Sequence, residues 1–326
     1  MREPSFSLLK QRLRLRQLRV AVAIAEHGSV MKASQHLRMT QPAATRSLLD
    51  LEQYLDVKLF DRLARGVTPT RAGETVLARA RRILAEVDRI PVDLMLLETG
   101  MVESLTIGVL PSASSGLMPQ VLARFNEDHV DTIVKFVEGR THELLPLLGS
   151  GKIDVIVGRL YETGTSDNFV RDRFYDEPLA ILARHGHPIF SRERRPTAAA
   201  LRRYSFILPT LEQRVGQDIE AAMRGNNLIP EKPVLRASSI SMIREVLLTS
   251  DRVSILSALA TVGDLMRGGL RIVPIPVETG TRPGGFVYGR GDLSPGVRAL
   301  REITFDYVNE LIAAGYVKAL PGAARV

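Results

Sequence analysis

The apolar residues change their spacing near residue 100, and this change constrains the fold more than any other feature of the 326-residue sequence. Before it, apolar residues recur every three or four positions, which is the period of an α-helix. After it, short apolar runs typical of buried strands alternate with helical segments. Strands that alternate with helices predict an α/β fold with parallel sheets and crossover connections. We therefore expect an all-α N-terminal part followed by a larger α/β part.

The N-terminal part contains the pattern of two short helices joined by a tight turn. His27-Gly28 ends a first helix, because glycine readily adopts the left-handed conformation of a helix stop. Ser29 is typical of an N-cap for the second helix, and Thr40 of an N-cap for the third. Pro42 fits the first turn of that third helix, where a missing N–H is tolerated. The turn of about three residues between the second and third helices is helix-turn-helix geometry.

A predicted hairpin and a long helix follow. Residues 62–70 combine Gly66 and Pro69 with β-branched residues, which predicts a short hairpin, or wing. From Arg71 on, apolar residues alternate steps of four and three in a seam about 40 Å long. The seam consists of Val76, Ala80, Ile83, Val87, Ile90, Leu94 and Leu97. It favours pairing between two chains over packing on its own domain. Pro91 is expected to kink or end this helix.

The charge of the chain is concentrated in the helical part. The net charge is +8, and residues 1–98 carry 17 Lys and Arg against 11 Asp and Glu, whereas residues 99–326 carry 27 against 25. A basic N-terminal unit favours a polyanion such as nucleic acid as partner, although surplus arginine on a solvated surface gives the same count.

The outward side of the third helix carries residue types that read base edges. Gln can bridge an adenine edge, Arg a guanine edge, and the methyl groups of Ala and Thr can contact a thymine methyl. Hydroxyl groups and the helix N-terminus can hold phosphate, and wing arginines suit phosphate or the minor groove. The same pattern also fits a plain three-helix packing unit with a polar outer face. We expect a DNA-binding site formed by Ser29, Thr40, Gln41, Pro42, Ala43, Thr45, Arg46, Ser47, Arg62 and Arg65.

Residues 13–82 resemble the LysR-type transcriptional regulators in register and spacing. The matching motifs are Gly28-Ser29-Val30, Ala33-Ser34, Leu37, Thr40-Gln41-Pro42-Ala43-Ala44-Thr45-Arg46, Leu51-Glu52, Leu59-Phe60-Asp61-Arg62 and Thr70-Arg71-Ala72-Gly73. Thr40 and Thr45 stand where serine is commoner, Pro69 stands where leucine is commoner, and Pro91 is an unexpected residue in the linker helix. The resemblance implies a homotetramer that binds an interrupted palindrome in promoter DNA and works with RNA polymerase. It also implies an effector domain of two α/β lobes, similar to a periplasmic binding protein.

The expected organisation has three parts. Residues 1–70 form the winged helix-turn-helix, residues 71–98 the linker helix used for dimerisation, and residues 103–326 the effector-binding domain. Lobe I is expected at about 103–162 and 277–326, and lobe II at about 168–275, with loops at 164–168 and 280–285 as crossing points. Expected strands include 105–110, 132–139, 154–160, 204–208, 233–240, 253–257, 270–275 and 286–290.

Polar residues follow three expected strands of lobe I, at the carboxyl ends where α/β lobes bind ligands. They are Ser112 and Ser114, Thr141, and Arg159. Their hydroxyls and guanidinium group suit a small organic acid, and the resemblance implies that Ser112, Thr141 and Arg159 line the effector cleft. Pro209 and Ser238 are expected on the facing wall. The alternatives are helix capping for Ser112 and Thr141, and an internal salt bridge for Arg159.

Other classes of protein find less support in the sequence. Cysteine is absent, so a disulfide, a thiolate metal site or a cysteine nucleophile is excluded. Nucleophile-elbow, dinucleotide-binding and phosphate-loop motifs are missing, and His185 and His187 lack a carboxylate at metal-ligand spacing. We therefore expect no cofactor, no metal and no catalytic activity, and a soluble cytoplasmic protein. The alternative is a solute-binding protein or small α/β enzyme with a helical N-terminal oligomerisation unit.

Overall fold

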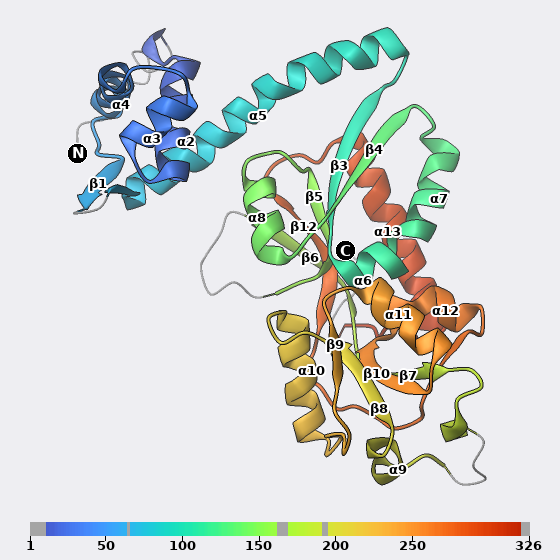
Figure 1. Ribbon diagram of the computed structural model, residues 1–326. Coiled ribbons are helices and arrows are strands. Elements are labelled where there is room, and N and C mark those ends of the chain that lie inside the picture. The colour runs from blue at the N-terminus through green and yellow to red at the C-terminus, as the bar shows by residue number, and fades with distance from the viewer. Residues whose placement is uncertain (1–10, 64–65, 162–168, 191–194, 321–326) are drawn as a thin grey trace. The chain divides into compact units, whose positions relative to one another are not determined.

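The computed structural model describes residues 11–63, 66–161, 169–190 and 195–320 (Figure 1). The chain divides into a helical N-terminal unit and an α/β unit, and each is described by itself. Among the described helices, none is long and apolar enough to cross a membrane. The described residues also contain no cluster of three or more metal-ligating side chains.

The N-terminal unit packs its helices around one small core. It contains α2 (Leu15–His27), α3 (Val30–His36), α4 (Gln41–Leu55), β1 (Phe60–Leu63), β2 (Gly66–Pro69) and α5 (Arg71–Thr99). The core includes Ile24 of α2, Leu51 of α4 and Leu77 of α5, all fully buried. These three side chains join the first helix, the third helix and the start of the long helix, so α4 is held with one face inward and the other outward.

The conformation of the wing depends on Gly66, which no other residue can replace without strain. β1 and β2 pair in antiparallel register, with Phe60 opposite Pro69. Gly66 has a φ of +108°, and a Cβ there would lie 2.4 Å from the carbonyl oxygen of Gly28. The Val67 N–H donates to that same oxygen at 2.9 Å. The start of β2 therefore lies directly on the turn between α2 and α3.

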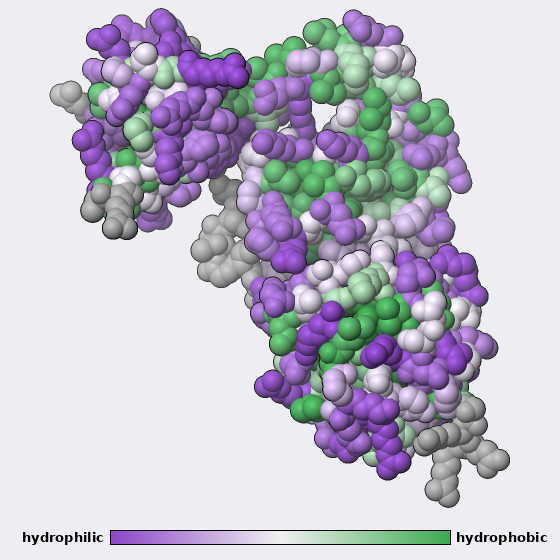
Figure 2. Space-filling model, in the orientation of Figure 1, coloured by the Kyte–Doolittle hydropathy of each residue, from purple (hydrophilic) through white to green (hydrophobic). Residues whose placement is uncertain are grey.

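α5 runs through Pro91 without ending there, so of the two expected effects, a kink or an end, the end is wrong. A proline removes one backbone hydrogen bond, which a helix of 29 residues tolerates. Leu77 and Ala80 are buried in the N-terminal core, whereas Ile90, Leu94 and Leu97 are 54%, 57% and 79% exposed. Apolar side chains, green in Figure 2, lie along the exposed stretch of this helix.

The first lobe of the α/β unit is built on a five-stranded sheet in the order β4-β3-β5-β12-β6. Its strands are β3 (Glu103–Val109), β4 (Thr132–Glu138), β5 (Val155–Arg159), β6 (Phe169–Asp176) and β12 (Pro283–Gly289). Its helices are α6 (Pro111–Gly116), α7 (Met118–Asp128), α8 (Thr141–Gly149) and α13 (Pro295–Ala313). β3 is parallel to β4 and β5, but β12 is antiparallel to β5 and β6, so the expected all-parallel sheet is wrong.

The second lobe is built on a five-stranded sheet in the order β11-β7-β10-β8-β9. Its strands are β7 (Leu179–Arg184), β8 (Ser205–Pro209), β9 (Leu235–Ala237), β10 (Arg252–Ser257) and β11 (Leu270–Ile272). Its helical segments are η1 (Pro188–Phe190), α9 (Ala198–Arg202), α10 (Arg214–Gly225), α11 (Ile240–Thr249), η2 (Ala258–Thr261) and α12 (Val262–Met266). β7 is antiparallel to β10 and β11, which makes this sheet mixed as well.

Two crossing segments connect the lobes, and they are hydrogen-bonded to each other. The chain leaves the first sheet after β6 at Asp176 and returns to it at β12. The expected start of lobe II near residue 168 is therefore wrong, because β6 belongs to the first sheet; residues 162–168 lie outside the described residues. The Glu177 N–H donates to the Arg282 carbonyl at 2.9 Å, and Arg282 Nε donates to the Glu177 carbonyl at 3.0 Å.

Candidate functional site

The outward face of α4 forms a shallow polar surface. Gln41, Thr45 and Arg46 lie there together with Leu49 and Asp50, all within the first three turns of the helix. The spacing explains the arrangement, since residues three or four apart share one side of a helix. The opposite side carries Ala44, Leu48 and Leu51 into the core. Figure 2 shows that the visible face of the N-terminal unit is mostly hydrophilic.

The structure separates Ser47 from the other expected DNA-binding residues. Ser47 is buried with 8% exposure, because it follows Ala44 by three positions and so joins the buried stripe. The expectation that Ser47 faces outward is wrong. In its place, Leu49 is 48% exposed on the outward face. Leu49 was missed because leucine in a helix pattern is normally assigned to the core.

The remaining expected contacts lie at the ends of helices or on the wing. Ser29 accepts a hydrogen bond from the Lys32 N–H at 3.5 Å, as an N-cap does. Thr40 stands at the N-cap position of α4 without a side-chain cap hydrogen bond among the described residues. Ala43 is half-buried, Pro42 is exposed at the start of α4, and Arg62 is exposed on β1. Arg65 lies outside the described residues.

A cavity of about 780 Å³ lies between the two lobes of the α/β unit. Four of the residues expected at the effector site line it: Ser112, Thr141, Arg159 and Ser238. Ser114 and Pro209 are not among the lining residues. Ser114 lies two positions beyond Ser112 on α6 and therefore points to another side of that helix. Pro209 is buried at the end of β8, where its carbonyl oxygen accepts a hydrogen bond from Arg236 at 3.1 Å.

Thr141 faces the cavity and does not cap a helix. α8 begins at Thr141, and the preceding Arg140 N–H is bonded instead by the Glu143 carboxylate at 2.7 Å. Thr141 Oγ1 is buried and has no hydrogen-bond partner within the described part of the chain. Such a group costs about 1–3 kcal/mol if it stays unpaired. The capping alternative for Thr141 is therefore wrong.

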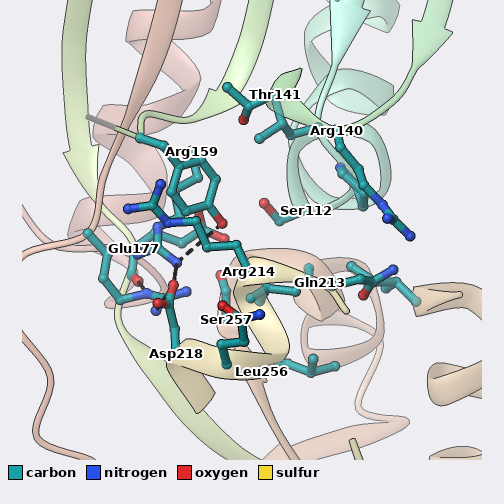
Figure 3. Close-up of a pocket in the computed structure, with 18 of the residues that line it drawn as sticks. Ser112, Arg140, Thr141, Arg159, Glu177, Gln213, Arg214, Asp218, Leu256 and Ser257 are labelled. Carbon is teal, nitrogen blue, oxygen red and sulfur yellow. Dashed lines mark hydrogen bonds and ion pairs between the residues drawn. The ribbon is translucent and has the colours of Figure 1, made fainter. Parts of the chain in front are cut away.

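Arg159 forms an internal ion pair with Asp218, which was the alternative to a role in ligand binding. Its Nη1 donates to Asp218 Oδ2 at 2.7 Å and lies 3.4 Å from the Tyr161 hydroxyl (Figure 3). Its Nε, however, is buried without a partner among the residues described. Arg159 and Arg214 each stack on the Tyr161 ring at 4.6 Å. Burial of Tyr161 raises the pKa of its hydroxyl, so this ring stays neutral between two cations.

The crossing segments add two charged residues that the sequence pattern did not single out. Arg282 and Glu177 both line the cavity, with 4% and 2% exposure. Burial lowers the pKa of Arg282, and the nearby Arg159 cation lowers it further. No local pattern marks these residues, because their position depends on how the two crossings meet.

A winged helix-turn-helix with an exposed polar face on its third helix, joined to a two-lobed α/β domain with a charged cleft, defines a ligand-responsive DNA-binding protein. The comparisons with known proteins give the family. Residues 15–74 match the model of the bacterial regulatory helix-turn-helix proteins of the lysR family, and residues 99–308 match the model of the LysR substrate binding domain. The chain belongs to the LysR family of DNA-binding transcriptional regulators, which respond to small-molecule effectors.

Known relatives resemble the chain over most of its length. The transcriptional regulator PcaQ of Agrobacterium fabrum is 31% identical over 282 residues, which cover 85% of this chain and 88% of PcaQ. The regulator GbpR of Azospirillum brasilense is 31% identical over 91% of this chain and 87% of its own length. The structure of full-length CbnR complexed with its target DNA has the same fold, with a TM-score of 0.53 at 20% identity, covering 90% of this chain and 99% of CbnR.

Proposed function

We propose that this regulator is controlled by a small organic anion bound in the cavity between the lobes. The observation that carries the proposal is that Thr141 Oγ1 and Arg159 Nε both lack a partner among the described residues and belong to cavity-lining side chains. A carboxylate oxygen accepts hydrogen bonds from a hydroxyl and from a guanidinium group. Ser112 and Ser238 add hydroxyl groups to the same cavity.

The effector site is tested with a variant that removes the cation but keeps an unbranched polar side chain. A collection of organic acids is screened by thermal shift against the wild-type protein, and each hit is tested again on Arg159→Gln. We expect every anionic hit to lose at least tenfold in affinity, while DNA binding without effector is unchanged. Hits that stabilise wild type and Arg159→Gln equally would show that the effector binds at a site that does not include Arg159.

We further propose that α4 reads operator DNA through Gln41, Thr45 and Arg46, with Arg62 on phosphate. The support is their shared outward face and the residue types, which match base edges in the major groove. Two copies paired along α5 would present two such helices to two half-sites, and a pair of dimers would form the tetramer. In this arrangement residues 1–70 bind DNA, 71–98 pair the chains, and the remaining α/β domain contacts effector and RNA polymerase.

Arg46→Ala tests the reading face. Loss of a bidentate arginine contact typically costs about 1–3 kcal/mol of discrimination between bases. We expect site-specific binding to its promoter fragment to disappear in gel shifts, while salt-sensitive non-specific binding at low ionic strength persists. Arg298→Ala is the matched control, since Arg298 is an exposed arginine on α13. Unchanged specific binding by Arg46→Ala would refute the assignment of the reading face.

A further inference from the structure

One carboxylate in the cavity serves two buried arginines. Asp218 Oδ2 lies 2.7 Å from Arg159 Nη1 and 3.6 Å from Arg282 Nη1. The Arg159 and Arg282 side chains are only 14% and 5% exposed, whereas the Asp218 side chain is 30% exposed. Arg159 ends β5 of the first lobe, and Asp218 stands on α10 of the second lobe. The ion pair therefore spans the cavity, as the dashed line from Arg159 in Figure 3 shows.

The two arginines need an anion between them. Buried like charges repel each other, and the lowered pKa of Arg282, caused first by burial and then by Arg159, reflects this. A buried cation that loses its counterion is strongly destabilising. With no effector bound, the Asp218 carboxylate pairs with both guanidinium groups, and the buried Glu177 carboxylate, whose charge raises the pKa of Arg282, adds a second negative charge.

Asp218 satisfies this need only in part. It engages Arg159 through Nη1, while Nε stays buried without a partner in the described part of the molecule. A free carboxylate can bind Nε and an Nη group together through two parallel hydrogen bonds. An effector carboxylate can therefore bind Arg159 with more hydrogen bonds than Asp218 makes.

We propose that Asp218 is a built-in competitor that fills the anion subsite of Arg159 and Arg282, and that the effector binds by displacing it with its own carboxylate. The inference rests on the proposed function of the cavity. Competition weakens the apparent affinity of the protein for the effector: the apparent Kd equals the intrinsic Kd divided by the fraction of molecules in which the subsite is free. Displacement also breaks an ion pair between the lobes, so that occupancy of the cavity changes what holds the lobes together.

Asp218→Asn tests the inference, because asparagine keeps the size of the side chain and removes its charge. The probes are malonate and inorganic sulfate, titrated by calorimetry into the full-length protein. We expect the Kd for malonate to fall at least tenfold relative to wild type, and sulfate binding to become measurable or tighter. Asp172→Asn is the matched control, since Asp172 on β6 pairs with Arg301 at 2.6 Å and does not line the cavity. Its Kd values should equal those of wild type.

The outcomes separate this inference from the proposed function. If Asp218→Asn binds both probes no better than wild type, or binds neither, Asp218 is not a competitor. If malonate binding is then still abolished by Arg159→Gln, the anion site stands and only the competitor role falls. Malonate binding that survives Arg159→Gln in the Asp218→Asn background overturns both. An unchanged circular dichroism spectrum shows that each variant is folded.

Discussion

His187 is a buried histidine whose hydrogen bonds fix its neutral form. The ring is 1% exposed; Nε2 lies 3.1 Å from the Asp251 carbonyl oxygen, and Nδ1 accepts the Ile189 N–H at 3.0 Å. A proton on Nδ1 would remove that acceptor. Burial lowers the pKa of His187, an effect that the adjacent Asp251 opposes and Arg184 reinforces.

This geometry predicts a loss of stability in mild acid. Because the folded-state pKa lies below the ordinary value of about 6.5, the unfolded chain binds the proton more readily. The contribution of His187 is complete above about pH 6.5 and is lost as the pH falls through that value toward the folded-state pKa. We expect the urea concentration at the unfolding midpoint to be lower at pH 5.5 than at pH 7.5. This decrease should be smaller in His187→Gln. The exposed His185→Gln should behave as wild type; an equal decline in all three proteins would contradict the prediction.

The residues of the effector cavity divide into those that local sequence can reveal and those that it cannot. Ser112, Thr141 and Arg159 follow strands, and parallel strands bring their carboxyl ends to one edge. Asp218 and Arg282 reach the cavity only because α10 faces the first lobe and the two crossings meet. Ser47 was placed wrongly for a different reason: it is a polar residue at a buried helical position, and polar residues are normally assigned to the surface.

At the scale of elements, Gly73 in the first turn of α5 is a position where only glycine fits. A Cβ on Gly73 would lie 2.0 Å from the Leu59 carbonyl oxygen, which is backbone and cannot rotate away. Gly73→Ala must push α5 away from the loop before β1, at a typical cost of about 1–3 kcal/mol.

The prediction for Gly73→Ala is a lower free energy of unfolding of the N-terminal unit and weaker promoter binding. Gly225→Ala is the control, because a Cβ there meets nothing within 4 Å at the end of α10. Its stability should stay within about 0.5 kcal/mol of wild type. Equal unfolding curves for the two variants in guanidinium chloride would show that α5 does not press on Leu59.

Most buried strands were predicted because apolar runs mark them, but the buried strand β7 (Leu179–Arg184) was missed. Ser239 and Ser294 cap α11 and α13 by accepting backbone N–H groups. β6 was missed because charged residues (Arg171, Asp172 and Arg173) interrupt its apolar pattern at the edge of a sheet. The expected strand at 233–240 was too long, since the N-cap of α11 at Ser239 shortens it to Leu235–Ala237.

At the scale of the whole molecule, the exposed apolar side of α5 predicts assembly through this helix. Ile90 is 54% exposed on this side of α5. Ile229 of the second lobe is 53% exposed and serves as the control position. A charge in an apolar helix seam disrupts pairing, whereas a charge on a free surface does not.

We expect Ile90→Glu to shift the protein to a smaller species in analytical ultracentrifugation, and to lower promoter affinity because two half-sites are no longer bound together. Ile229→Glu should sediment as wild type. If Ile90→Glu keeps the wild-type sedimentation coefficient, the chains associate through another surface.

The paired crossings between Asp176 and β7, and between β11 and β12, have a mechanical consequence. A single tether would let one lobe swivel against the other in every direction. Two tethers bonded at Glu177 and Arg282, together with the hydrogen bond from Ser115 Oγ to the Ala260 carbonyl oxygen, restrict how one lobe can turn against the other. Because Arg282 belongs to this paired crossing and also lines the cavity, an anion held by its guanidinium group lies directly beside the connection between the lobes.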